Sequence, residues 1–94
     1  MLHIGVLQFS LEIPWSESLK DKRRAVKSLK DRLRQGYNVS VAEIDDQDDR
    51  RLATLGLVMA GPDKRYINGA LDKILALLQE HPEGELTGHQ MEIL

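Results

Sequence analysis

Residues 7–20 read LQFSLEIPWSESLK, and this stretch contains the boundary between a strand and a helix on which the fold depends. Its first half alternates apolar and polar side chains, which is the period of two that a β-strand requires. Pro14 stops this alternation, and Ser18 with Asp21 three residues later has the spacing of a helix capping box. The sequence therefore predicts a strand over residues 2–13, followed closely by a helix.

The predicted first strand carries two apolar patterns that are out of step. Leu2, Ile4 and Val6 lie on one face, whereas the apolar residues from Leu7 onward lie on the other. Either a bulge near Gly5 rotates the strand, or both faces of its first half are covered. We favour covered faces, because a strand in the centre of a sheet achieves this without distortion.

The rest of the chain adds two strands, a second helix and a last strand. The first helix is expected to end at Gly36 as a left-handed residue, with Tyr37 folding back onto its apolar stripe. The other predicted elements are strands over 38–44, 52–60 and 85–94, and a helix from the turn Gly61-Pro62-Asp63 to His81-Pro82. Two right-handed βαβ crossovers joined by a hairpin give one domain, residues 1–94, with a four-stranded antiparallel sheet and both helices on one face. This is the ferredoxin-like α+β sandwich.

Composition narrows the classes of function. The chain has no cysteine, which excludes disulfides, thiolate metal sites and cysteine nucleophiles. No stretch approaches the ~20 apolar residues of a membrane span, and the N-terminus lacks the basic region of a signal peptide. We therefore expect a cytoplasmic protein that needs no cofactor and has no membrane partner.

Basic residues are concentrated in the first helix, since eight of the thirteen Lys and Arg residues fall between Lys20 and Arg34. Winding this segment at about 100° per residue gathers six cations on one flank of the apolar stripe, with only Asp31 among them. The six are Lys20, Arg23, Arg24, Lys27, Lys30 and Arg34. Lys22 lies near the stripe, where its stem is expected to cover the core, and Arg32 falls on the other flank.

Such a flank can follow a phosphate backbone, so the six cations are the candidate nucleic-acid-binding residues. A solvated helix surface is the plainer interpretation, and an adaptor that docks an acidic protein through the same helix is the alternative function. Stacking of RNA bases on the sheet is not expected, because Phe9 is the only aromatic residue within a predicted strand.

Other chemistry is weakly indicated. The acidic run from Asp45 to Asp49 lacks the glycine and distal Glu of a calcium loop, so a solvated turn is favoured over a metal site. The three histidines are scattered, and no catalytic group can be assembled from them. Trp15, the only tryptophan, is expected to cap the core rather than to stack on a base.

The open face of the predicted sheet is a candidate surface for self-association. Leu2, Ile4 and Val6, joined by Val58, would leave an apolar patch there that isolated monomers normally avoid. A homo-oligomer formed through this face would cover the patch and present two basic helices.

Several segments together resemble the YlxP-like family. They are SLKDKRR at residues 18–24, NVSVAE at 38–43, ATLG at 53–56 and the ending from Glu80-His81-Pro82 to Leu94. The family consists of small bacterial proteins of unknown function with a ferredoxin-like fold, whose genes often lie among those for translation initiation and ribosome maturation. The resemblance therefore implies RNA or a ribosomal particle as partner. The hairpin departs from the family pattern at Asp46 and at residues 49–51, so contacts made by that loop are not carried over.

Overall fold

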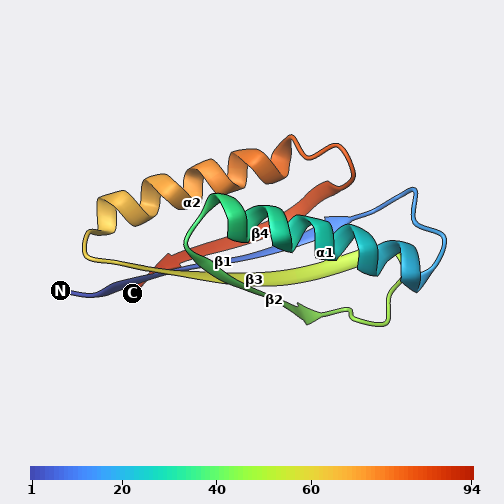
Figure 1. The fold of residues 1–94 in the computed structure, drawn as a ribbon, viewed down its shortest axis with the longest axis horizontal. Helices are drawn as coiled ribbons and strands as arrows, with labels where there is room; N and C mark the ends of the chain where they lie inside the picture. Colours follow the sequence, from blue (N-terminus) through green and yellow to red (C-terminus); the bar gives the residue numbers. More distant parts are fainter.

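The computed structural model describes all 94 residues of the chain. The elements follow one another as strand, helix, strand, strand, helix and strand (Figure 1), in the predicted order. Their bounds are β1 His3–Glu12, α1 Leu19–Gly36, β2 Val39–Asp45, β3 Leu52–Gly61, α2 Lys64–Gln79 and β4 Glu85–Ile93.

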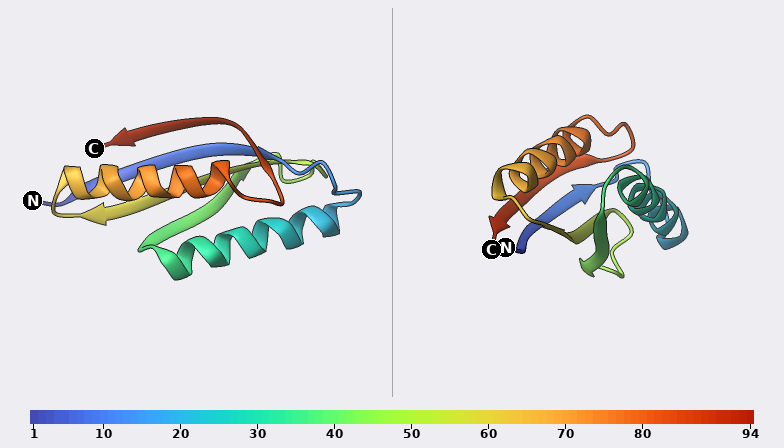
Figure 2. Two further views of the ribbon diagram at one scale, coloured as in Figure 1. Left: turned by 90° about the horizontal axis from the view of Figure 1, so that it is seen from above. Right: turned by 60° about the vertical axis from the view of Figure 1, so that its left-hand side comes forward.

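The four strands form one antiparallel sheet in the order β2-β3-β1-β4, so β1 and β3 are central and β2 and β4 are edges. Both helices cover the same face of this sheet, and the opposite face carries no other element (Figures 1 and 2). The predicted ferredoxin-like α+β sandwich is therefore confirmed. Neither helix has the length and apolar character needed to cross a bilayer.

The core lies between the sheet and the two helices. It contains 18 buried apolar residues, and Phe9 is its only aromatic member, as the composition requires. β1 contributes Leu7, Phe9 and Leu11 from its helix-facing side, while Ile67 and Leu71 of α2 are fully buried above it. Burial of each such side chain contributes about 1.5–3 kcal/mol, so the alternation of β1 is a main source of stability.

The out-of-step pattern of β1 has a simple origin. Pairing with β3 continues without interruption along both strands, so a bulge near Gly5 is wrong. Gly5 instead occupies a helix-facing position where a side chain would collide with Ile67 and Leu71. Ile4 and Val6 point to the open face, and Ile4 is 38% exposed. The favoured interpretation, that both faces of this segment are covered, is therefore also wrong for the single chain.

The ends of α1 differ from the prediction in one respect. Ser18 Oγ accepts a hydrogen bond from the Asp21 N–H at 3.1 Å, and Asp21 in turn accepts from the Glu17 N–H at 3.2 Å, which caps the helix as predicted. Gly36 is the last helical residue and has no positive φ, so the predicted left-handed glycine is wrong. Tyr37 is extended, ends the helix and packs against the core, as expected.

Candidate nucleic-acid interface

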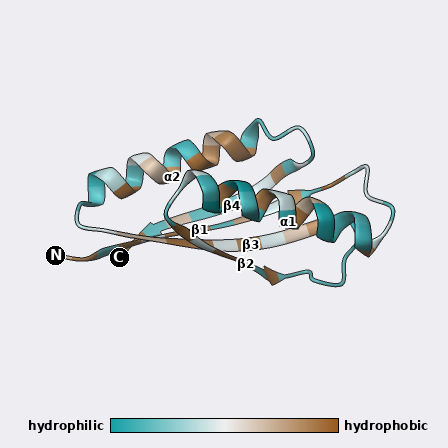
Figure 3. Cartoon of the chain, in the orientation of Figure 1, coloured by the Kyte–Doolittle hydropathy of each residue, from teal (hydrophilic) through white to brown (hydrophobic).

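The buried side of α1 is wider than the predicted stripe. It is formed by Lys22, Ala25, Val26, Leu29 and Leu33, whereas Leu19 is only half-buried. Including Ala25 and Lys22 rotates the buried side relative to the prediction, since helix positions three and four apart share a face. The remaining surface of α1 is strongly hydrophilic (Figure 3).

This rotation divides the six predicted cations into two groups. Lys20, Arg24 and Lys27 lie opposite the buried side and point away from the sheet, as their spacing of three and four residues requires. Arg23, Lys30 and Arg34 lie on the side of α1 that faces the edge strand β2. The Arg34 guanidinium shows that this side faces β2, because its Nη2 donates a hydrogen bond to the Val41 carbonyl of that strand at 2.9 Å. We call the six residues together the basic surface.

Two aspartates neutralise part of the basic surface. Arg24 forms an ion pair with Asp21 at 3.1 Å, and Lys27 forms one with Asp31 at 2.8 Å. A hydrogen bond from Lys27, helped by the nearby charges of Arg34 and Lys30, lowers the pKa of Asp31 below its ordinary value. Both ion pairs are largely exposed, so water and salt screen them.

The other cations of the basic surface form weaker ion pairs or none. Lys20, Arg23 and Lys30 form no ion pair, and Arg34 is 3.9 Å from Asp31, which is a weak contact. Six cations against the two aspartates leave a net positive surface.

One further cation belongs with this surface, although the sequence placed it on the other flank. Arg32 is exposed and lines a shallow depression of about 440 Å³ on α1 together with Arg24, Lys27, Ser28, Asp31 and Gln35. By helical spacing Arg32 still lies on the other flank, beside buried Ala25, so it is the length of its side chain that brings it to the depression. Helical spacing gives the direction in which a side chain leaves the helix but not how far a long side chain extends.

Lys22 has a role that the sequence did not reveal. Its side chain is fully buried instead of covering the core with an exposed head, and its Nζ lies 2.8 Å from Glu43 Oε2 of β2. The same ammonium donates to the Asp46 carbonyl at 2.7 Å and reaches the Gln47 carbonyl at 3.4 Å. Glu43 Oε2 is buried without another partner, so this ion pair is its only compensation. Lys22 therefore fastens the β2–β3 loop to α1 and is unavailable to a ligand.

The acidic β2–β3 loop uses its carboxylates internally. Asp46 accepts a hydrogen bond from the Thr54 hydroxyl at 2.7 Å. Asp49 accepts from the backbone N–H groups of Arg51 and Leu52, at 2.8 and 2.9 Å, and these bonds lower its pKa. No three acidic or histidine side chains lie together in a way that could hold a metal ion.

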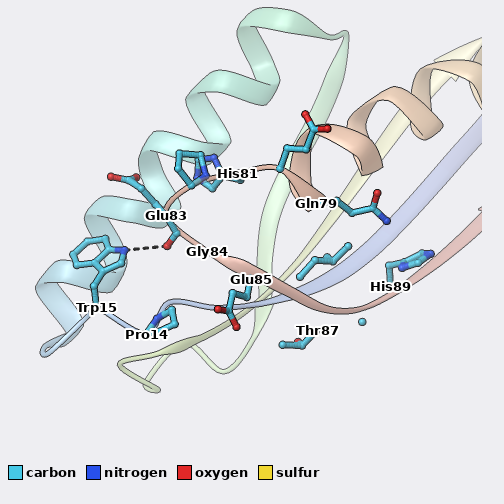
Figure 4. Close-up of a pocket in the computed structure, with 13 residues that line it drawn as sticks. Pro14, Trp15, Gln79, His81, Glu83, Gly84, Glu85, Thr87 and His89 are labelled. Atoms are coloured by element: carbon cyan, nitrogen blue, oxygen red, sulfur yellow. Dashed lines mark hydrogen bonds between the residues drawn. The ribbon is translucent and has the colours of Figure 1, made fainter.

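A concavity of about 750 Å³ lies away from the basic surface, between the β1–α1 loop, the end of α2 and β4 (Figure 4). Trp15 is 43% exposed at its rim, where its Nε1 donates to the Glu83 carbonyl at 2.9 Å. The predicted core-capping role of Trp15 is therefore wrong. His81 and His89 also line this concavity, and burial lowers the pKa of His81.

The concavity does not assemble a catalytic pair. No hydrogen bond joins His81 or His89 to a carboxylate or hydroxyl group, and His81 Nδ1 is buried without a partner. His3 lies at the start of β1, so the three histidines do not converge.

Comparisons with known proteins identify related chains. The chain matches, over residues 4–91, the family model described as a protein of unknown function, DUF503. It is also 31% identical over 84 residues to the uncharacterized protein YlxP of Bacillus subtilis (strain 168). That alignment covers 89% of this chain and 91% of the relative.

Proposed function

This chain belongs to the DUF503 family of proteins of unknown function, and we propose that it is a non-enzymatic, RNA- or ribosome-associated protein that binds phosphates through the basic surface of α1. The membership confirms the YlxP-like resemblance of the sequence. The observation that carries the proposal is the concentration of six cations along a single helix, on its outward side and on its side toward β2.

The dimensions of the basic surface fit a phosphate backbone. At about 1.5 Å per residue, the segment from Lys20 to Arg34 is about 21 Å long. One strand of a duplex carries a phosphate about every 3.4 Å along its axis, so this length spans about six phosphates. Contacts of this kind depend on salt and carry little base information, and we expect no sequence preference.

The genomic setting that the YlxP-like resemblance implies directs the proposal toward the ribosome. Two features of this chain make RNA the favoured partner over an acidic protein. Its cations extend along about 21 Å of α1, a length over which an extended phosphate backbone can be followed. The ion pairs of Asp21 with Arg24 and of Asp31 with Lys27 are exposed and screened, so a phosphate can displace them.

Charge reversal tests this proposal. The triple variant Arg24→Glu, Lys27→Glu and Lys30→Glu should weaken co-sedimentation with ribosomal particles and reduce the slope of log K against log salt by about 2–3. The matched control reverses three exposed cations of α2, by Lys64→Glu, Arg65→Glu and Lys73→Glu, and should bind like the wild type. Circular dichroism establishes that both variants fold.

A single substitution that removes a negative charge from the basic surface gives an independent test. Asp31→Asn removes the carboxylate that holds Lys27 and should strengthen binding at low salt. Co-sedimentation that is unchanged in the α1 triple variant across a salt series would refute the proposal. Association that survives nuclease treatment would instead identify an adaptor that docks an acidic protein.

A further inference from the structure

The open face of the sheet is apolar at its centre. On the two central strands, Val6 of β1 lies directly opposite Val58 of β3, and Ile4 lies opposite Ala60. Val58 is 44% exposed, although valine on a solvated sheet face is normally replaced by a polar residue. Leu2 and Leu94 extend this apolar area and are exposed by 67% and 60%.

The charge of the open face differs from that of the rest of the molecule. Its charged side chains all lie on edge strands or at strand ends, and all are acidic: Glu12, Asp45, Glu85 and Glu92. No Lys or Arg side chain belongs to this face. The acidic rim would repel a nucleic acid and also an identical rim, the latter less at high salt, whereas the uncharged centre resembles the charge-depleted core of a protein interface.

The open face has a raised part and a hollowed part. Ile44, the extra residue of a bulge in β2, lies over Gly56 and is 47% exposed, so together with Val58 it forms a ridge on one half. On the other half, a shallow depression of about 390 Å³ lies between β1 and β4 over Val6 and Gln90. A two-fold axis would place the ridge of one copy over the depression of the other, which is the condition for an isologous contact.

The size of the face approaches that of a dimer interface. Four strands of about 4.8 Å spacing, the longest with 10 residues at about 3.3 Å each, give a flat footprint of about 600 Å². A standard interface buries about 800 Å² per partner, so this footprint is about three quarters of that area. Leu2 and Leu94 lie outside the footprint and add to it.

We propose that the open face binds a second copy of this chain, sheet against sheet, to form a two-fold symmetric dimer. The helices of both copies then lie on the outside, so the dimer carries two basic surfaces on opposite sides. Because the buried centre is apolar and the rims are both acidic, rising salt should favour this dimer, whereas it weakens phosphate binding.

Sedimentation equilibrium over a concentration series tests the dimer. The wild type should approach twice the chain mass of 10.7 kDa, and more readily at high salt. Val58→Lys should remain at the chain mass, whereas Val58→Thr, which keeps the β-branched shape, should weaken the dimer only slightly. Tyr66→Lys, at a 64% exposed aromatic on α2, is the control outside the face and should dimerise like the wild type.

A second measurement does not depend on the folding of Val58→Lys. Because the chain has no cysteine, Ala42→Cys on the open face and Gln35→Cys on α1 each introduce a single thiol. The thiol at position 42 should react more slowly with a maleimide as protein concentration rises, while that at position 35 should not change. A wild type that stays monomeric throughout, or a dimer that Val58→Lys leaves intact, overturns the proposal.

Discussion

Replacing Lys22 by methionine is the most informative perturbation of stability that the structure offers. The Lys22 ammonium has no exposed surface, lies 2.8 Å from Glu43 Oε2 and donates to the Asp46 carbonyl at 2.7 Å. Methionine keeps the unbranched apolar stem but removes the charge and all three donors. Glu43, whose side chain is only 17% exposed, then keeps a carboxylate with nothing nearby to offset its desolvation.

The expected cost follows from this geometry. Removing one partner of a buried ion pair typically costs about 3–5 kcal/mol. Because Glu43 retains some contact with water, we expect a value near the lower end, about 3 kcal/mol. Domains have a free energy of unfolding of about 5–15 kcal/mol, so the variant should fold but lose a large share of its stability.

Urea unfolding followed by circular dichroism measures this loss. For a slope of about 1–3 kcal/mol/M, the midpoint should fall by about 1–3 M at unchanged slope. Glu43→Gln and the double variant Lys22→Met with Glu43→Gln complete a double-mutant cycle. The double variant should lose much less free energy of unfolding than the sum of the two single losses. Arg24→Met, which removes only an exposed ion pair, should remain close to the wild type. A loss below about 1 kcal/mol for Lys22→Met, or additive losses in the cycle, would refute the reasoning.

Three further changes test the packing and the pH dependence. Gly5→Ala places a methyl group against the core side chains of α2, 2.9 Å from Leu71 Cδ1, and should lower the free energy of unfolding by about 1–3 kcal/mol in the same urea assay. Gly36→Ala, at a helical position where a side chain meets nothing, should instead raise it by about 0.5–1 kcal/mol. Burial lowers the pKa of His81 below 6.5, so the unfolded chain binds more protons and the wild type should lose stability as pH falls through 6.5, until the folded pKa is reached. His81→Gln should remove part of this slope; a slope equal to that of the wild type in urea titrations at several pH values would contradict this assignment.

The fold could be predicted because its signals are local. The alternation up to Ile13, the cap at Ser18 and the turn at Pro62 each act over a few residues, and the βαβ handedness rule then leaves one topology. Predictions from the sequence were wrong where the surroundings of a residue are set by residues far away in the sequence. At Gly5 the close approach of α2 leaves no room for a side chain, and no feature of the β1 sequence indicates this approach.

The candidate site was predictable only as a set of residues. Helical spacing gathers the cations on one side of α1, but the orientation of α1 is fixed by the burial of Ala25 and Lys22. Spacing predicts that Lys22 lies near the apolar stripe with its stem over the core, whereas its ammonium pairs with Glu43 on a separate strand. The buried side formed by Lys22 and four apolar residues therefore sets which cations of α1 face outward.

The open face and the basic surface impose opposite requirements on the same small domain. A row of cations is stable on a single helix only if it faces water or a polyanion, which excludes it from a sheet-to-sheet contact. The apolar centre around Val6 and Val58 must in turn be kept from water, which the helices cannot do from the other side of the sheet. Because the two surfaces lie on opposite faces of the sheet, the proposed dimer would leave the cations of the basic surface exposed. Salt separates the two associations, since it should weaken the contact of the basic surface and strengthen that of the sheet.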